Sequence, residues 1–305
     1  MPVAVKPQHR RVYSAPPKQV KLCMPSSPID RFYFPKQKAS NPMHLPDGME
    51  TLKTISQDSA FTNRRYAFFL DYDGTLTPIV DNPDKAIIAE NTRGVINQLA
   101  ESFDTAIVTG RSLNKIQDLM KLENCYYAGS HGWDIQGPKG SEIRKRIGEK
   151  FLSRFKKAMK MLDEILDRFE GASVEDNVFS ISIHYRKLDE SKVGELEEEV
   201  DRIVEKLGML KRTGKMVFEI RPAFNWHKGK AVDYLVKLLQ DQDEDIIPVY
   251  IGDDDTDEDA FKALNGRGIS VIVTDEPSDK NTHADLRLSD PSEVREFLGY
   301  FARST

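Results

Sequence analysis

The chain has 305 residues, of which 39% are hydrophobic, and a formal net charge of −5. This length predicts about two domains, and because no apolar run approaches the ~20 residues that span a bilayer, we expect no membrane partner. Residues 1–46 hold eight Lys or Arg and one acid, a balance of +7 that leaves −12 on the remainder. An acidic body argues against nucleic acid as a partner, since phosphate backbones select basic surfaces. The two cysteines, Cys23 and Cys125, have no spacing typical of a metal site or a disulfide framework, which favours a reducing compartment.

Residues 1–60 are predicted to be a disordered, basic, proline-rich tail. Nine of the 16 prolines fall within the first 46 positions, and no sustained helical or strand period is visible. An organelle transit peptide is the alternative, because the tail is basic and poor in acids, although it lacks serine richness and a convincing amphipathic helix. We therefore expect a cytoplasmic protein, with a plastid as the alternative. The sequence identifies no partner for the tail.

From about residue 64, short apolar runs end in polar turns. These runs are Tyr66–Leu70, Thr105–Val108, Pro248–Ile251 and Ile269–Val273. Amphipathic helical stretches fall between them, which is typical of a parallel sheet that is buried on both faces. In such sheets ligands bind beyond the carboxyl ends of the strands. We therefore expect the chemistry where these runs end.

Residues 136–222 follow a different pattern and are predicted to form an inserted cap domain. Apolar residues mark one helix face from Phe151 to Phe169 and another from Val193 to Leu207. An alternating strand follows each helix, Val178–Arg186 and then Lys215–Arg221. One-sided helices and one-sided strands suggest an open-faced α/β sandwich. The predicted catalytic core is therefore residues 61–135 and 223–305.

Two groups of acids follow two of the apolar runs. Asp71 and Asp73 stand at the tip of the first run, where extended geometry gives them a common face, and Gly74 lets the chain turn away. Residues 253–259 hold six acids in seven positions without the ligand spacing of an EF-hand. Taken alone, this second group fits a solvated acidic loop about as well as a metal site. Two such groups at two strand ends predict a shared hard cation such as Mg²⁺, because burying uncompensated carboxylates is costly.

Two further polar side chains belong with these acids. Thr109 ends the second apolar run with a hydroxyl that could bind a phosphate oxygen, and Lys228 stands just before a helix expected from about Lys230. A lysine ammonium can neutralise both phosphate and carboxylate charge. In isolation, Thr109 would be interpreted as a turn residue and Lys228 as a surface charge.

In this order, Asp71–Thr75, Thr109, Lys228 and Asp253–Asp257 resemble the four motifs of the haloacid-dehalogenase superfamily. The chain is more closely similar to plant-type trehalose-6-phosphate phosphatases over roughly residues 65–300, through the stretches LDYDGTLTPIV, VTGRS, YYAGSHGWD, HYR, EIRP and IGDDDTDEDAF. The resemblance implies an α/β fold, with a Rossmann-like core around a parallel sheet and an inserted C2-type cap. It also implies a hydrolase of trehalose biosynthesis that converts trehalose 6-phosphate to trehalose and phosphate.

The resemblance further implies the roles of individual residues. Asp71 would be the nucleophile that forms an aspartyl-phosphate, and Asp73 would be the general acid and base. Thr109 and Lys228 would hold the transferring phosphoryl group. Mg²⁺ would be held by the carboxylates of Asp71 and Asp253 and by the backbone carbonyl of Asp73. Asp254 and Asp257 would be further ligands or would orient the others.

The predicted cap strands suggest how a sugar would bind. Each strand alternates between an apolar face for the cap helices and a polar face with hydrogen-bond donors and acceptors. A sugar, which is polar around its rim, suits such a face, although ordinary solvent exposure would produce the same alternation. Together with turn residues near the junction of core and cap, the predicted substrate-binding set is Gly110, Arg111, Ser130, His131, Gly132, His184, Arg186, Lys215, Glu219 and Arg221.

Two other functions fit the sequence less well. Another capped sugar phosphatase, or a phosphosugar mutase, would share the core motifs, but the HYR and EIRP stretches disfavour it. A sensor that binds sugar phosphate without turnover should have lost an acid of the motifs, and all of these acids are present.

Overall fold

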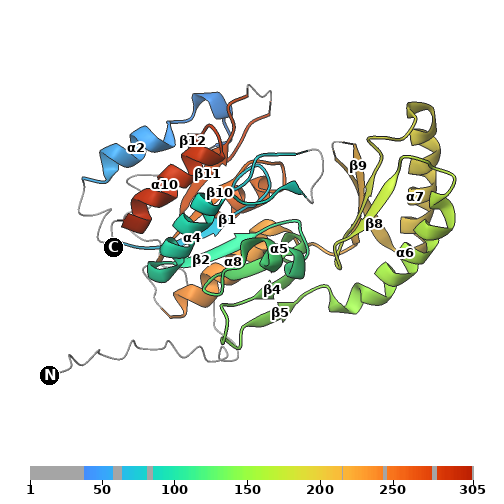
Figure 1. The fold of residues 1–305 in the computed structure, drawn as a ribbon, viewed down its shortest axis with the longest axis horizontal. Coiled ribbons are helices and arrows are strands. Elements are labelled where there is room, and N and C mark those ends of the chain that lie inside the picture. The colour runs from blue at the N-terminus through green and yellow to red at the C-terminus, as the bar shows by residue number, and fades with distance from the viewer. Residues whose placement is uncertain are drawn as a thin grey trace.

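The structure is a computed structural model that describes residues 38–57, 64–80, 85–214, 216–242, 246–276 and 280–303. These residues form one sheet of eight strands and one of four, each with its own helices (Figure 1). The larger sheet and its helices make up one end of the molecule, and the smaller sheet with α6 and α7 makes up the other. Within the described ranges, no helix is long and apolar enough to cross a membrane.

The larger sheet has the strand order β12-β11-β10-β1-β2-β3-β4-β5, in which the pairs from β12 to β3 are parallel and the last two are antiparallel. Its strands are β1 (Arg65–Leu70), β2 (Asp104–Val108), β3 (Tyr126–Gly129), β4 (Asp134–Gln136), β5 (Arg144–Arg146), β10 (Ile246–Gly252), β11 (Ile269–Val273) and β12 (Leu286–Leu288). The four predicted runs correspond to β1, β2, β10 and β11, which confirms the predicted parallel sheet.

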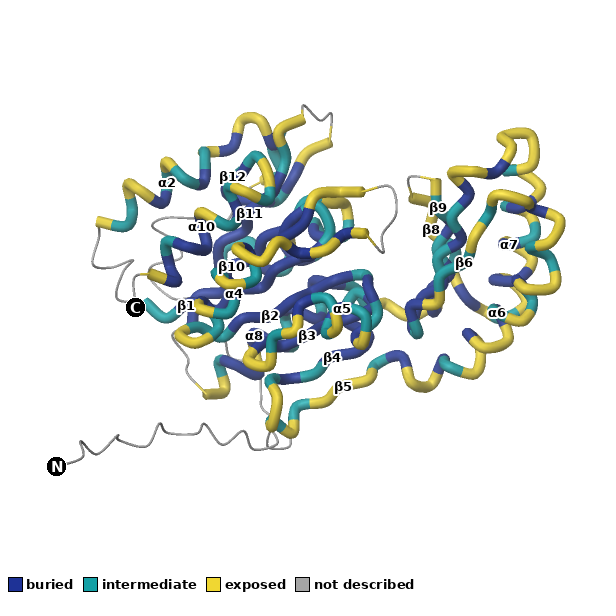
Figure 2. Tube along the Cα trace, viewed as in Figure 1, coloured by how far each residue is buried: buried dark blue, intermediate teal, exposed yellow. Residues whose placement is uncertain are grey.

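Helices cover both faces of the larger sheet, which explains why its central strands are apolar at nearly every position. The central strands of this sheet are buried (Figure 2, dark blue). Phe68 and Phe69 of β1 point to opposite faces and belong to two separate apolar cores, and both are fully buried. The helices that pack on the Phe68 face are α2 (Gly48–Ile55), α4 (Glu90–Ser102), α5 (Leu113–Met120) and α10 (Pro291–Arg303). Those on the Phe69 face are α8 (Lys228–Gln240) and α9 (Glu258–Leu264).

The smaller sheet is antiparallel, with the order β6-β7-β9-β8, and it packs one face against α6 and α7. Its elements are β6 (Ser173–Asp176), β7 (Ile181–His184), β8 (Met209–Gly214), β9 (Val217–Pro222), α6 (Leu152–Leu166) and α7 (Val193–Leu207). Short 3₁₀ segments are η1 (Pro42–His44), η3 (Ser130–Gly132), η4 (Glu149–Phe151) and η5 (Glu190–Lys192). Two sheets of these types, one mostly parallel and one antiparallel, confirm the predicted fold class. The larger sheet extends to Arg146 in β5, beyond the predicted start of the cap at residue 136. The boundary between core and cap stays a prediction.

One predicted cap strand is wrong in its extent. The sequence predicted a single strand over Val178–Arg186, whereas β7 is limited to Ile181–His184. Val178 has a φ of 68° and lies in the hairpin turn from β6 to β7, where the Asp176 side chain accepts a hydrogen bond from its N–H. The Asp-Asn pair at the start of this turn is a turn signal that the alternating pattern concealed.

The predicted tail is also wrong for residues 38–57. Ser40 forms a β-bridge with Thr282, and α2 packs into the core through Leu52, which is 2% exposed. Asp47 caps this helix by accepting a hydrogen bond from the N–H of Glu50, a local signal that the proline-rich composition masked. Residues 1–37 and 58–60 of the predicted tail lie outside the described residues.

Because Leu52 is buried, Leu52→Ala should lower the free energy of unfolding by about 2–4 kcal/mol, through lost transfer energy and the cavity left behind. Urea denaturation followed by circular dichroism measures this change. Lys53→Ala, an exposed substitution in the same helix, is the control and should stay near the parent value. Equal effects of the two substitutions would show that α2 does not belong to the folded core.

Candidate active site

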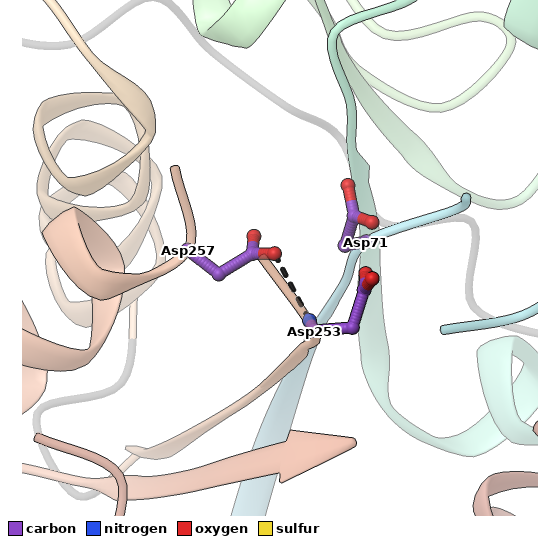
Figure 3. A group of neighbouring side chains, drawn as sticks. All are labelled: Asp71, Asp253 and Asp257. Atoms are coloured by element: carbon purple, nitrogen blue, oxygen red, sulfur yellow. Dashed lines mark hydrogen bonds between the residues drawn. The ribbon is translucent and has the colours of Figure 1, made fainter. Parts of the chain in front are cut away.

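Three buried or half-buried carboxylates meet at the carboxyl ends of β1 and β10. Asp71 directly follows β1 and Asp253 directly follows β10, and these strands are parallel neighbours that pair Leu70 with Ile251. Asp257 begins the turn into α9, and carboxylate oxygens of all three residues lie within 4.8 Å of one another (Figure 3). The register of the two strands therefore brings the two predicted acid groups together.

Lys228 lies inside this cluster. As the first residue of α8 it is 2% exposed, and its Nζ is 2.7 Å from both Asp71 Oδ1 and Asp257 Oδ1. Burial alone would lower its pKa, but these two carboxylates raise the pKa of Lys228 well above its ordinary value, so it is an ammonium. Asp254 is more distant, with Oδ1 at 3.9 Å from the same Nζ.

With all three acids ionised, the cluster would have more negative than positive charge. Three carboxylates face one ammonium, and burial together with repulsion from Asp257 raises the pKa of Asp253 to about 8. Burial is also the main reason that the pKa of Asp71 is raised. An all-oxygen donor set with uncompensated charge fits a hard divalent cation, which would relieve this repulsion.

Asp257 organises the acidic loop. Its Oδ1 accepts hydrogen bonds from Lys228 and the Tyr250 hydroxyl, at 2.7 and 2.5 Å. Its Oδ2 accepts from the backbone N–H groups of Asp253 and Asp254, both at 3.1 Å (Figure 3 shows the first of these). With both oxygens engaged in this way, Asp257 fixes the direction in which the loop presents Asp253.

Asp73 is held by Arg111. The guanidinium Nε lies 2.8 Å from Asp73 Oδ2 and Nη2 lies 2.5 Å from Oδ1, a bidentate pair. Arg111 is buried, and its guanidinium carbon lies 5.2 Å from the centre of the Tyr72 ring. The Thr109 hydroxyl accepts a hydrogen bond from the Arg111 N–H at 3.2 Å. The turn after β2 therefore sets the direction of Asp73 at the end of β1.

A strained turn after β3, in the core, makes hydrogen bonds to residues of the cap. Ser130, His131 and Gly132 all have positive φ, at 50°, 55° and 84°, a region that residues other than glycine adopt at a cost. The Ser130 hydroxyl donates to the Asn177 carbonyl in the cap at 2.5 Å, and His131 Nε2 lies 2.7 Å from Arg221 Nη2 in β9. Burial and the Arg221 charge lower the pKa of His131, so its neutral Nε2 accepts this hydrogen bond.

A cleft of about 280 Å³ lies between core and cap above these residues. The core contributes an aliphatic side and a polar floor, and the cap contributes polar side chains. The lining residues are Asp73, Ile79, Val80, Gly110, Arg111, His131, Glu175, Asn177, Ser182 and Glu219.

The remaining residues of the predicted substrate set lie around this cleft or away from it. Arg221 lies 2.6 Å from Glu219 and supports its orientation, while His184 Nε2 lies 3.4 Å from Glu175. Arg186 is exposed in the turn after β7 and is not among the cleft residues. Lys215 lies outside the described residues.

Sequence reasoning missed Glu175 and Asn177 as cleft residues. Glu175 pairs with Ser182 across β6 and β7, and Ser182 pairs with Glu219 across β7 and β9, so the three side chains form one polar row on the cap sheet. Had the turn signal at Asp176 and Asn177 been used to place β6, strand alternation would have put Glu175 on this face.

The fold and the site together define an enzyme of the haloacid-dehalogenase-like class, as the order of the sequence motifs predicted. Solved structures share the fold, and two of them are named for trehalose-6-phosphate phosphatases. One described as a trehalose-6-phosphate phosphatase related protein has a TM-score of 0.67 and 27% identity, over 78% of this chain and 97% of that one. The C-terminal domain of Candida albicans trehalose-6-phosphate phosphatase has a TM-score of 0.69 and 24% identity, over 86% of this chain and 100% of that one.

Sequence comparison gives the family. Residues 69–292 match the family model for trehalose-phosphatase. Trehalose-phosphate phosphatase B of Arabidopsis thaliana is 42% identical over 285 residues, covering 90% of this chain and 75% of that protein. Trehalose 6-phosphate phosphatase RA3 of Zea mays is 39% identical, covering 87% of this chain and 80% of that protein. The chain belongs to the trehalose-phosphatase family.

Gly74 allows Asp253 to approach the end of β1. Its φ is +82°, and a Cβ at this position would lie 2.1 Å from Asp253 Oδ2. Gly74→Ala should therefore displace this carboxylate and reduce kcat by roughly 100-fold, the cost of a misplacement of about 1 Å. Steady-state phosphate release measures the change in kcat, and a thermal melt measures any change in stability.

Gly140→Ala is the matched control, because Gly140 has a φ of +85° but a Cβ at this position would meet no atom within 4 Å beyond its chain neighbours. Gly140→Ala should lose a small amount of stability, because alanine is strained at positive φ, but it should keep the activity of the native chain. If both variants retain activity, close packing of Gly74 against Asp253 is not needed for the site.

Proposed function

We propose that the chain hydrolyses trehalose 6-phosphate to trehalose and phosphate through an aspartyl-phosphate on Asp71, with Mg²⁺ as the cofactor. The observation that carries this proposal is the buried contact of Lys228 with Asp71 at a strand end. Asp73, two residues further along the chain, lines a cleft with a polar cap wall. The names of the related proteins support the substrate. A phosphate-release screen over a panel of sugar phosphates, with and without Mg²⁺, tests it directly.

In the first step, an oxygen of Asp71 attacks phosphorus and the bond from phosphorus to the sugar oxygen breaks. This covalent step divides one difficult displacement into two easier ones. Asp73 donates a proton to the departing sugar oxygen, and Arg111 holds its carboxyl group at the edge of the cleft. Lys228 and the Thr109 hydroxyl stabilise the charge on the transferring group.

In the second step, water attacks phosphorus of the aspartyl-phosphate and the bond to Asp71 breaks. Asp73, which lost its proton in the first step, now takes one from the attacking water. Phosphate leaves and the free Asp71 carboxylate returns to its contact with Lys228. One carboxyl group thus acts as acid and then as base at the same position.

The residues present fit a magnesium ion. Asp71 and Asp253 would hold it together with the backbone carbonyl of Asp73, while Asp254 and Asp257 would orient the loop or add ligands. When bound, Mg²⁺ offsets negative charge on the nucleophile and on the phosphoryl oxygens. The uncompensated charge of the cluster is the structural support for this assignment.

The polar row of the cap supports recognition of a sugar. Glu219 and Ser182 line the cleft. Arg221 contacts the Glu219 carboxylate and is itself held by His131. We propose that hydroxyl groups of the sugar bind along this row and that the phosphate lies near Thr109. Gly110 leaves room for the His131 ring, because a Cβ at this position would lie 2.9 Å from His131 Nε2. Ser130 and Gly132 contribute through the turn that carries His131, and His184 contributes through its contact with Glu175.

Asp71→Asn keeps the shape of the nucleophile and removes its charge, so turnover should fall by about 10⁴-fold or more while the fold is retained. Phosphate release and a circular dichroism spectrum measure the two outcomes. Asp118→Asn, a substitution on α5 away from the cleft, serves as the control. Substantial steady-state turnover by Asp71→Asn would overturn the nucleophile assignment.

Removal of divalent cations with EDTA should abolish activity, and added Mg²⁺ should restore it, because clustered carboxylates and phosphate otherwise repel. Asp253→Ala should raise the Mg²⁺ concentration needed for half-maximal activity by about tenfold or more, as expected for the loss of a ligand. A titration of activity against Mg²⁺ gives both results. Full activity of the native chain in chelator would contradict a metal-assisted reaction.

Glu219→Gln keeps the size of a side chain that lines the cap wall but weakens its hydrogen bonds to sugar hydroxyls. We expect kcat/KM for trehalose 6-phosphate to fall by roughly 10- to 100-fold, about 1–3 kcal/mol. Activity on a small aryl phosphate, which does not reach the cap, should change by less than about threefold. Equal losses on both substrates would instead indicate damage to the core, and would reject sugar recognition by Glu219.

A further inference from the structure

An ion pair crosses from the core to the cap at the edge of the cleft. Lys115 in α5 of the core has its Nζ 2.6 Å from Glu175 Oε1 in β6 of the cap. The two side chains are 29% and 28% exposed, so both are mostly shielded from water. A pair in this environment is screened less by salt than a surface pair.

The position of Lys115 in its helix calls for an explanation. It is the third residue of α5, in the first turn, where the partial positive charge of the helix terminus disfavours a cation. The helix itself therefore gains nothing from a lysine here. One of its contacts is the Glu175 carboxylate, from the other half of the molecule, and this contact favours a lysine at this position.

Glu175 is well placed to meet a bound sugar. Its Oε1 accepts from Lys115, its Oε2 lies 3.4 Å from His184 Nε2, and the residue lines the cleft next to Ser182. Its contacts with His184 and Lys115 lower the pKa of Glu175 to about 2, against the effect of burial. The carboxylate is therefore ionised and has its direction fixed from two sides, one of which is the core.

We propose that Lys115 is a positioning residue, whose ion pair with Glu175 holds the cap closed on the core and directs the Glu175 carboxylate toward sugar hydroxyls in the cleft. The pair spans two separate sheets with their helices, so it exists only when the cap lies against the core. It thus couples the position of the cap to the shape of the sugar site. The part of this inference that concerns sugar rests on the proposed function, and the part that concerns closure does not.

The test uses Lys115→Met in the full chain, which removes the charge and keeps the length of the side chain. The control is Lys139→Met, because Lys139 pairs with Glu123 at 2.5 Å but both residues belong to the core side and are exposed. For trehalose 6-phosphate, we expect Lys115→Met to raise KM by about fivefold to tenfold with a smaller change in kcat, while a small aryl phosphate changes by less than about twofold. The control should match the native chain on both substrates.

Small-angle X-ray scattering gives a measure that does not depend on turnover. Lys115→Met should shift the ligand-free protein toward a larger radius of gyration, and added salt should shift the native chain in the same direction. The charge-reversed double variant, Lys115→Glu with Glu175→Lys, should recover the compact shape because the pair is restored in the opposite sense.

The outcomes separate this inference from the proposed function. If Lys115→Met matches Lys139→Met in both kinetics and scattering, the ion pair has no positioning role and the inference is overturned. Equal losses on sugar phosphate and aryl phosphate, with an unchanged scattering profile, would also overturn it. If the native chain fails to hydrolyse trehalose 6-phosphate, the proposed function falls, while the scattering comparison still decides whether Lys115 holds the cap closed.

Discussion

The site depends on a buried ammonium shared by two carboxylates. Lys228 is 2% exposed and lies 2.7 Å from Asp71 and from Asp257, and removal of one partner from such a buried group leaves a charge without compensation. Three separate parts of the chain must converge to form this contact, namely the end of β1, the loop after β10 and the first turn of α8. The packing of the larger sheet and its helices makes that convergence possible, because the parallel register of β1 and β10 fixes two of the three positions.

The cap has a different constraint, since its sheet must satisfy two environments at once. Ile183 and Phe218 pair on the face that packs against α6 and α7, while Ser182 and Glu219 pair on the face toward the cleft. The polar face is completed by the core, through the Ser130–Asn177 hydrogen bond and the His131–Arg221 contact. The proposed substrate site is therefore a property of the two parts in contact, and neither part contains it alone.

The segment before β1 belongs to the same structure. The bridge from Ser40 to Thr282 brings residues 38–57 beside the edge of the larger sheet, and the Thr282 hydroxyl donates in turn to Glu258 at the start of α9. Glu258 follows Asp257 directly in sequence. Residues 38–57 are therefore linked, through Thr282 and Glu258, to the acidic loop of the site. The predicted tail of residues 1–60, which was based on proline content, therefore included residues 38–57, although these residues pack against the core.

The sequence by itself determined the local elements and the identity of the chemical groups. Apolar runs that are buried on both faces produced correct strands at β1, β2, β10 and β11, and a strong helical period located α7 at Val193–Leu207. Such patterns are local, because burial of a strand or a helix face is imposed residue by residue along one segment. The acids of the two groups and Lys228 were found in the same way, each from its position after a strand or before a helix.

Only the tertiary structure decided which of these groups touch. Pairing of Arg111 with Asp73, of Arg221 with His131 and of Lys115 with Glu175 joins residues 38, 90 and 60 positions apart. Strand alternation assigns a residue to a face but does not give the partner opposite that face. The direction of a side chain such as Arg111, toward a carboxylate of the same site, follows from packing between distant segments, and no local pattern in one sequence contains that information.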